Sequence, residues 1–220
     1  MIHIVLVEPK NEGNLGAVAR VMKNFGFKSL IIVNPQCSIG EEARRRAVHA
    51  NDILASARTI KHFPKLDYLI ATSSKTGRDY NIPRNPITPD ELSRIIPENG
   101  EVGLIFGREE NGLTNEELGK CDFMVKIPTS NEYPSMNLSH SVAVILYELS
   151  KSSHSTGITP ISLAEKKQLA KMLGGVLNKM NFRSKEKKET QKMVWKKIIG
   201  RTFMSKREAY ALMGFFRKLI

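Results

Sequence analysis

The stretch "FMVKIPTSNEYPSMNLSHSVAVILYE", residues 123–148, combines a short apolar run, a polar loop and an amphipathic helix. The run "FMVKI" has the length of a strand, and apolar residues recur at helical spacing from Leu138 to Leu149. The connection between them is rich in Pro, Ser, Thr and Asn and is long for a link of this kind. Long loops in compact domains are commonly functional, so this one is a candidate binding loop.

Four further apolar runs of strand length precede this stretch. They are "HIVLV" (3–7), "SLIIV" (29–33), "YLIAT" (68–72) and "VGLIF" (102–106). Most are apolar throughout, which is typical of strands covered on both faces. A helical stripe between the first two runs consists of Leu15, Val18, Met22 and Phe25. Strands that alternate with helices predict an α/β fold with a mostly parallel sheet.

The pattern changes after residue 150. Residues 151–160, "KSSHSTGITP", are typical of a linker, and the rest of the chain has a helical pattern with capping boxes at Ser162/Glu165 and Ser205/Glu208. The residues expected to face inward are Leu169, Met172, Leu173, Val176, Leu177 and Met180, then Met193, Val194 and Ile198, then Leu212, Met213 and Phe216. We therefore predict an α/β domain over residues 1–155 and a small all-helical extension over residues 156–220.

The composition is that of a globular protein, because 41% hydrophobic residues are enough to build a core. No apolar run approaches the roughly 20 residues of a membrane-spanning helix. The N-terminus has neither a basic leader nor a small-residue cleavage site, so we expect a cytoplasmic protein. Cys37 and Cys121 are far apart in sequence, and no Cys/His cluster has the spacing of a zinc site, so neither a disulfide framework nor a metal site is expected.

Positive charge is concentrated at one end of the chain. Residues 1–150 contain 17 Lys and Arg against 18 Asp and Glu, whereas residues 151–220 contain 17 Lys and Arg against 4 Glu. The net charge of the second part is therefore +13. Such asymmetry indicates an anionic partner, a nucleic acid or a membrane surface, for the extension.

The segments that follow the strands are the candidate site, because ligands of open parallel sheets bind beyond the carboxyl ends of the strands. One of them, "GREENGLTNEE", has glycines at P-loop spacing, Gly107 and Gly112. Leu113 stands where that motif has Lys, and Glu109 and Glu110 would repel a triphosphate. The Rossmann glycine pattern and the HExxH and GxSxG motifs are absent as well. These enzyme classes are therefore disfavoured.

Three segments together resemble the motifs of the SPOUT superfamily of RNA methyltransferases, in the SpoU/TrmH branch that methylates ribose 2′-hydroxyls. They are "NEGNLGAVARVMKNFG" (11–26), "IFGREENGLTNEEL" (105–118) and "IPTSNEYPSMNLSHSVAVILYE" (127–148). The resemblance covers about residues 3–150, and the "LVEP" start and helical extension look most like the TrmJ-type enzymes. It implies a tRNA 2′-O-methyltransferase acting on nucleotide 32 of the anticodon loop, a trefoil knot in the sheet domain, and a homodimer.

The resemblance also implies that the knotted loops bind S-adenosylmethionine. Carried over to this sequence, the residues that line the cofactor pocket are Thr72, Ser73, Ser74, Gly107, Ile127, Pro134, Ser135, Met136 and Leu138. Their types suit an adenosine group. Small residues and free backbone groups can hydrogen-bond adenine, and the longer apolar side chains offer it a hydrophobic surface.

The implied reaction is an in-line attack of a ribose 2′-oxygen on the sulfonium methyl group, which needs two positioned reactants and removal of a proton. The motif-one arginine of the family is Arg20, which lies opposite the apolar stripe of its predicted helix. A guanidinium group is effectively always protonated and is a poor general base. We therefore expect Arg20 to stabilise the developing alkoxide and an adjacent phosphate, with the proton going to the RNA or to water.

Other residues are candidates to orient Arg20 and the RNA backbone. They are Asn14, Glu109, Ser135 and Asn137, for which a plain role in loops or caps is the alternative. Asn14 is the expected N-cap of its helix. In the family homodimer, Arg20 of one subunit faces the cofactor loop of the other. The small residues Gly16 and Ala17 beside Arg20 are compatible with such a contact.

The extension offers an independent argument for RNA binding. The basic residues outside its apolar stripes are Lys166, Lys167, Lys171, Lys179, Arg183, Lys185, Lys187, Lys188, Lys192, Lys196, Lys197 and Arg201. They predict a surface that contacts phosphates with an affinity that falls as salt rises. Trp195 and Phe203 are expected in the core of the extension, and stacking on RNA bases is the alternative for both.

Two other functions stay open at this point. Ribosomal RNA is a possible substrate of the same chemistry, and a non-catalytic RNA-binding factor is possible on the same fold. The presence of Arg20, Gly107, Ser135 and Asn137 argues against the non-catalytic factor.

Overall fold

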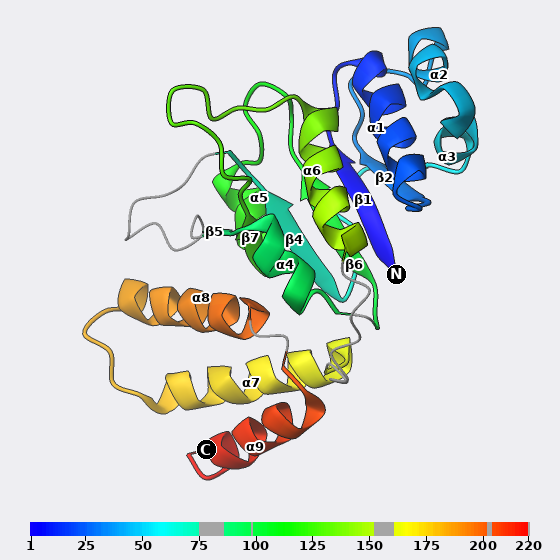
Figure 1. The fold of residues 1–220 in the computed structure, drawn as a ribbon. Helices are drawn as coiled ribbons and strands as arrows, with labels where there is room; N and C mark the ends of the chain where they lie inside the picture. The colour runs from blue at the N-terminus through cyan, green and yellow to red at the C-terminus, as the bar shows by residue number, and fades with distance from the viewer. Residues whose placement is uncertain (75–85, 98, 152–160, 202–203, 220) are drawn as a thin grey trace. The chain divides into compact units, whose positions relative to one another are not determined.

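The computed structural model describes residues 1–74, 86–97, 99–151, 161–201 and 204–219 (Figure 1). The chain forms two compact units. The first, here called the sheet unit, consists of Met1–Arg94 and Glu101–Ser153, and the second, the helical unit, of Ile95–Gly100 and His154–Ile220. In the ranges that are described, no helix is both long enough and apolar enough to cross a membrane.

The sheet unit contains a parallel sheet whose described strands follow the order β3-β2-β1-β6-β4-β7-β5. Their bounds are β1 Ile2–Val7, β2 Ser29–Val33, β3 Arg58–Ile60, β4 Tyr68–Thr72, β5 Pro86–Ile87, β6 Val102–Phe106 and β7 Phe123–Val125. The predicted α/β fold with a parallel sheet is confirmed, and the five predicted strands are β1, β2, β4, β6 and β7. The sequence did not predict β3 and β5, which are short strands at the two edges.

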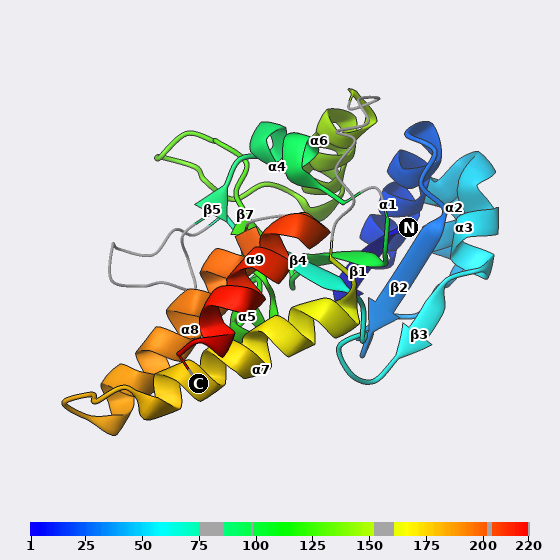
Figure 2. The ribbon, with the colours of Figure 1, turned by 90° about the horizontal axis from the view of Figure 1, so that it is seen from below.

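Helices of the sheet unit lie on both faces of this sheet, and Figure 2 shows α1 (Glu12–Asn24) and α6 (Leu138–Lys151) on one side of it. On the other side, Leu118 of α5 (Asn115–Lys120) packs in one cluster with Val5, Ile31 and Ile105. Alternate residues of each central strand therefore enter different cores. This two-sided burial explains why the strand sequences are apolar throughout.

The predicted apolar stripes of α1 and α6 are buried, and Phe25 lies half-buried just after the end of α1. The predicted N-cap of α1 is wrong. Asn11 caps the helix, and its side-chain oxygen accepts a hydrogen bond of 3.2 Å from the backbone N–H of Asn14. Both residues are asparagines near the start of the helix, so cap preference alone does not distinguish them.

Three further helical segments follow β2, namely α2 (Glu41–Ala47), the 3₁₀ turn η1 (Val48–Ala50) and α3 (Asn51–Ala55). Gly16 of α1 allows α2 to pack closely, since a Cβ atom at Gly16 would lie 2.1 Å from the carbonyl oxygen of Ala43. Gly16 therefore serves the packing of its own chain. It gives no support to a contact between subunits. The remaining helix described in the sheet unit is α4 (Pro89–Ile95).

In the helical unit, the described helices are α7 (Leu163–Lys179), α8 (Lys185–Arg201) and α9 (Lys206–Arg217). Both predicted capping boxes are present, at the start of α7 and of α9. The core consists of Ile161, Leu169, Met172, Leu173, Val176, Leu177, Ile199, Met204, Ala209, Met213 and Phe216, and the half-buried Leu212 and Trp195 pack against it. Phe203 lies outside the described residues.

Four predictions for the helical unit are wrong. Met180 and Ile198 are 53% and 46% exposed, Lys197, expected on the surface, is buried, and the Nζ atom of Lys166, also expected on the surface, is buried as well. Met180 follows the end of α7 as its C-cap, where the helical period no longer applies. The sequence of α8 is only weakly amphipathic, so its period does not determine which face is buried.

Candidate functional site

A cleft of about 1060 Å³ lies in the sheet unit where the segments after β1, β4, β6 and β7 meet. Every residue predicted for the site lines this cleft except Arg20. These residues are Asn14, Thr72, Ser73, Ser74, Gly107, Glu109, Ile127, Pro134, Ser135, Met136, Asn137 and Leu138. The structure thus brings together residues that are far apart in sequence.

The topology of the sheet accounts for the position of the cleft. Strands β2 and β3 extend the sheet on one side of β1, and β6, β4, β7 and β5 extend it on the other. The loops after β1 and β6 therefore diverge at this point, and crevices at such switch points are the usual ligand sites of parallel sheets. Because all the strands run in the same direction, their polar carboxyl-end segments reach the same edge.

A chain of side-chain hydrogen bonds links three of these segments. The Nδ2 atom of Asn14 donates to Oε1 of Glu109 at 3.0 Å, and Nδ2 of Asn137 donates to Oδ1 of Asn14 at 3.1 Å. The residues belong to α1, to the loop after β6 and to the loop before α6. Asn14 is only 9% exposed, and both the nitrogen and the oxygen of its side-chain amide take part in these bonds.

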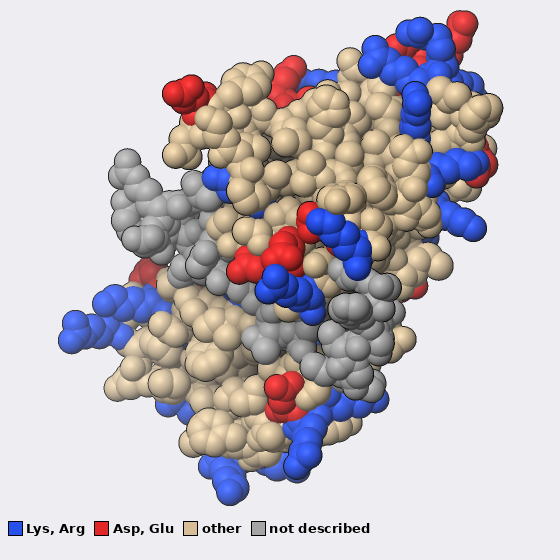
Figure 3. Space-filling model, viewed as in Figure 1, with Lys and Arg blue, Asp and Glu red and all other residues tan. Residues whose placement is uncertain are grey.

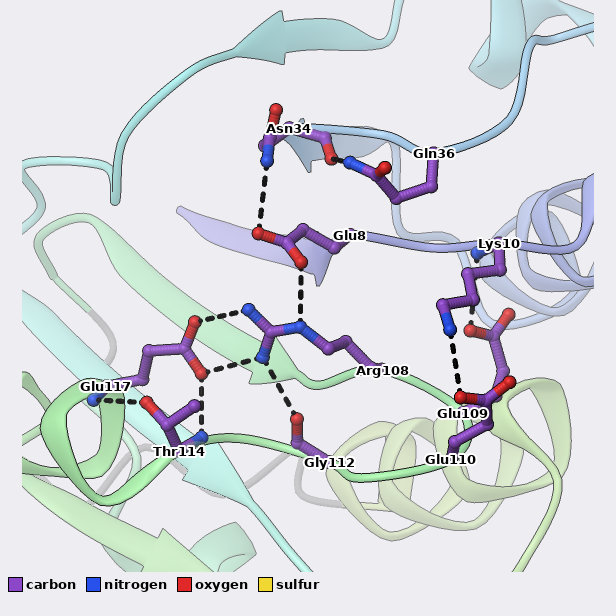
Figure 4. A network of polar contacts seen from close by, with 10 residues as sticks. All are labelled: Glu8, Lys10, Asn34, Gln36, Arg108, Glu109, Glu110, Gly112, Thr114 and Glu117. Carbon is purple, nitrogen blue, oxygen red and sulfur yellow. Dashed lines mark hydrogen bonds and ion pairs between the residues drawn. The ribbon is translucent and has the colours of Figure 1, made fainter.

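The two ends of this chain are held by further bonds. The backbone N–H and the hydroxyl of Ser139 both donate to Oδ1 of Asn137, at 2.9 and 2.8 Å, which places Asn137 at the start of α6 as a capping residue. The other oxygen of Glu109 accepts from the backbone N–H of Lys10 at 3.3 Å, and Nζ of Lys10 pairs with Glu110 (Figure 4). The orientations of Glu109 and Asn137 are therefore fixed without a ligand.

Arg108 is a site residue that the sequence did not indicate. Figure 4 shows its guanidinium group between two carboxylates, with Nε donating to Glu8 at 2.8 Å and Nη1 and Nη2 donating to Glu117 at 3.0 and 2.9 Å. Nη1 also donates to the carbonyl oxygen of Gly112 at 3.2 Å. The arginine thereby ties the loop after β6 to the end of β1 and to α5.

This cluster shifts the pKa values of its members. The hydrogen bond from Arg108, with a second from Asn34, holds the pKa of Glu8 below its usual value. Burial raises the pKa of Glu117, but the bonds from Arg108 and Thr114 outweigh burial and leave that pKa lowered. Both carboxylates are therefore ionised near neutral pH, as their bonds to the guanidinium require.

Gly107 begins the loop after β6 at a point where no side chain fits. A Cβ atom there would lie 2.4 Å from the carbonyl carbon of Gly112 and 2.5 Å from the backbone nitrogen of Leu113. The loop folds back on itself through a bridge between Arg108 and Gly112, whose φ of 66° favours glycine. Gly107 and Gly112 both line the cleft, so this fold shapes one of its walls.

The wall made by the loop before α6 combines polar and apolar groups. Within it, the hydroxyl of Thr129 donates to the carbonyl oxygen of Pro134 at 3.1 Å. Cleft-lining residues that the sequence did not indicate include Tyr133 and His140, which flank the predicted ones. Hydroxyls, backbone groups and apolar side chains together suit a ligand with polar and apolar parts, such as a nucleoside. Within the described ranges, His, Cys, Asp and Glu side chains form no group that could hold a metal ion.

Arg20 lies outside the cleft of its own chain. It follows Asn14 by six residues on α1, which is about 9 Å along a helix axis. Its side chain is exposed, and the described part of the chain contains no hydrogen bond or ion pair to it. The structure therefore does not bring Arg20 to the other predicted site residues of the same chain.

Comparison with known proteins gives consistent results. The sequence model of the SpoU rRNA Methylase family matches residues 1–147. The tRNA (cytidine-2′-O-)-methyltransferase TrmJ of Methanocaldococcus jannaschii is 44% identical over 99% of both chains. The enzyme of the same name from Sulfolobus acidocaldarius is 34% identical over 99% of this chain and 93% of its own. The crystal structure of TrmJ from Z. mobilis ZM4 covers 100% of this chain and 99% of its own, with a TM-score of 0.69 and 26% identity.

Proposed function

Because this chain belongs to the SpoU rRNA methylase family, we propose that it transfers the methyl group of S-adenosylmethionine to a ribose 2′-hydroxyl of tRNA. The observation that carries the proposal is the cleft at the strand ends, which is lined by the family's motif residues. The full-length relatives named above are tRNA enzymes, which favours tRNA over ribosomal RNA as the substrate.

The cleft fits the donor in two respects. Gly107 leaves the backbone of one wall free of side chains, and Ile127, Met136 and Leu138 offer apolar surface for an adenine ring. Thr72, Ser73, Ser74, Pro134 and Ser135 complete the proposed donor site. When bound, the donor supplies an electrophilic methyl group. The proposal includes the trefoil knot that the motifs imply for this part of the chain.

The protein's own contribution to the reaction is positioning and electrostatic stabilisation. We assign Asn14, Glu109 and Asn137 the task of holding the three loops in register around the acceptor ribose. We assign Ser135, which lines the same cleft as Asn137, to contact with the RNA backbone. Arg20 of the partner subunit stabilises the alkoxide that forms as the hydroxyl loses its proton.

A homodimer is part of this proposal. Arg20 is exposed, its side chain is unpaired within the described chain, and it does not line its own cleft, so it is available to a second copy. Asn14, on the same helix, is bonded into the cleft. A dimer that places α1 of one subunit against the cleft of the other would couple the two sites.

The helical unit is assigned to tRNA binding. Its exposed basic side chains include those of Lys167, Lys171, Lys179, Arg183, Lys185 and Lys187. Such a surface neutralises phosphates without reading sequence, so it suits the recognition of tRNA as a shape. We further propose nucleotide 32 of the anticodon loop as the target, and the cytoplasm as the place of action.

The substrate is tested by incubating the protein with methyl-labelled S-adenosylmethionine and with separate tRNA and ribosomal RNA pools, followed by mass spectrometry of nuclease fragments. The expected result is label on the ribose of nucleotide 32 in tRNA. Label on ribosomal RNA alone would show that ribosomal RNA, and not tRNA, is the substrate. Label at another tRNA nucleotide would show that the target is not nucleotide 32. Label on neither RNA would refute the proposed function.

A further inference from the structure

Three consecutive arginines, Arg44, Arg45 and Arg46, lie on α2 with exposed side chains. The part of the chain to which α2 belongs is close to electrically neutral, with 17 Lys and Arg against 18 Asp and Glu in residues 1–150. The three arginines of α2 therefore form a local excess of positive charge in an otherwise neutral part of the chain. Figure 3 shows basic side chains gathered over α2, at the upper right of that view.

The acidic residues nearby neutralise this charge only in part. One carboxylate, that of Glu42, accepts from Arg45 at 2.7 Å and from Arg46 at 2.6 Å, and these two arginine side chains remain 71% and 54% exposed. Arg44 makes no ion pair in the described part of the chain. The helix dipole favours cations in the last turn of α2. One carboxylate shared by two of the three arginines cannot bond all of their N–H groups, so several of these donors are directed to solvent.

The packing of α1 places α2, which carries these arginines, against the side of α1 on which Arg20 lies. Gly16 faces Ala43 of α2, and the side chain of Arg46 lies against Gly13. Arg20 follows Gly16 by one helical turn and so shares its face of α1. On the same face, Nζ of Lys23 donates to the carbonyl oxygen of His49 in η1 at 2.7 Å. Arg20 therefore lies on the side of α1 against which α2 and η1 pack.

We propose that Arg44 and Arg45 bind phosphates of the RNA strand on either side of the ribose that Arg20 of the same subunit contacts. This inference rests on the proposed function. A guanidinium group binds phosphate through two parallel hydrogen bonds, and such contacts fix the register of a strand without reading its bases. Arg46 is not included, because its side chain packs on Gly13.

The test is tRNA binding by the Arg44→Gln/Arg45→Gln variant of the full chain, measured at several salt concentrations. We expect an affinity about 10-fold weaker than that of the unaltered protein at moderate salt. The slope of log K against log salt should fall by about 1.5, because each lost phosphate contact removes roughly 0.7 to 0.9. Affinity for S-adenosylmethionine should not change.

Two control variants make the result specific. Arg94→Gln removes an arginine that is also 71% exposed and also paired with a carboxylate on its own helix, that of Asp90, and it should leave both the affinity and the slope unchanged. Arg44→Lys/Arg45→Lys keeps the charge and should restore most of the slope.

The inference is overturned if the double Gln variant binds tRNA with the unaltered affinity and slope. It is also overturned if that variant loses affinity for S-adenosylmethionine in parallel, because the arginines would then act through the fold. Failure of the proposed function is recognised separately, as an absence of methyl transfer to tRNA by the unaltered protein.

Discussion

The amide of Asn14 and the carboxylate of Glu109, which are 95 residues apart in sequence, are joined by a hydrogen bond of 3.0 Å. Asn137 extends the link to the loop before α6. The three segments that surround the cleft are therefore held together by polar side chains as well as by the sheet beneath them. A buried link of this kind is costly to break on one side only, because the remaining groups lose their partners.

The Asn14→Ala variant tests this link. It should unfold with a free energy about 1 to 3 kcal/mol lower than that of the unaltered protein, since Glu109 and Asn137 lose a buried partner. Methyl transfer should fall by at least about 10-fold, because the loops lose their register. Chemical denaturation and steady-state kinetics measure the two effects. Asn24→Ala, at the exposed end of the same helix, is the control, and equal effects in both variants would contradict the role of the link.

Gly107→Ala probes the wall of the cleft. The added Cβ atom would lie within 2.5 Å of two backbone atoms, so the loop must move, and overpacking of this kind typically costs about 1 to 3 kcal/mol. Affinity for S-adenosylmethionine, measured by calorimetry, should fall more than about 10-fold. Gly119→Ala adds the same atom inside α5 with nothing within 4 Å, and should be neutral or stabilising. If Gly107→Ala binds S-adenosylmethionine with unchanged affinity, the donor does not contact this wall of the cleft.

Arg108→Met tests the ion cluster through pH. The folded-state pKa values of Glu8 and Glu117 are below the usual 4.5, so their contribution is complete above that pH and is lost as the pH falls through the lowered values. At pH 7 the variant should be about 2 to 3 kcal/mol less stable than the unaltered protein. Thermal melts from pH 7 to pH 3 should show this difference shrinking in acid. A difference that is constant with pH would exclude the cluster as its source.

A control separates this cluster from surface ion pairs. Arg94 pairs with Asp90 at 2.8 Å, and the two side chains are 71% and 57% exposed. Exposed pairs of this kind contribute about 0 to 1 kcal/mol. Arg94→Met should therefore have a melting temperature close to that of the unaltered protein at every pH.

The role of the helical unit is tested with three exposed lysines of α7. Lys167→Gln/Lys171→Gln/Lys179→Gln should weaken tRNA binding and lower its salt dependence by at most about 1 per lysine. Affinity for S-adenosylmethionine should be unaffected. The control, Lys28→Gln/Lys61→Gln/Lys65→Gln, removes the same charge from exposed positions of the sheet unit. Identical salt slopes for the two triple variants would argue against a special role for α7.

Much of the fold is predictable from the sequence because the central strands are covered on both faces. Their runs are apolar without interruption, so β1, β2, β4, β6 and β7 are recognisable by composition alone. The edge strands β3 and β5 have three and two residues, too few to show a pattern. In α8 the buried residues include Lys197 as well as Ile199. The expectation that every lysine of this helix lies on the surface is therefore wrong.

The site is predictable in part for a similar reason. Parallel strands deliver their carboxyl-end loops to one edge, so Asn14, Glu109 and Asn137 could be expected to lie near one another. Their hydrogen bonds depend on side-chain orientations that sequence does not specify. Arg108 was missed because an arginine after a strand is usually exposed, whereas here Glu8 and Glu117 hold it at 17% exposure.

Methyl transfer by Arg20→Ala is the measurement that tests the central claim most directly. In the proposed reaction the donor is bound in the cleft of one subunit, and the guanidinium group of Arg20 from the other subunit stabilises the acceptor oxygen. The unaltered protein should therefore yield 2′-O-methylated nucleosides from tRNA by mass spectrometry. Arg20→Ala should yield none while its calorimetric affinity for S-adenosylmethionine stays within about 3-fold, a difference below about 1 kcal/mol. Methylation near the unaltered rate in Arg20→Ala would contradict the account.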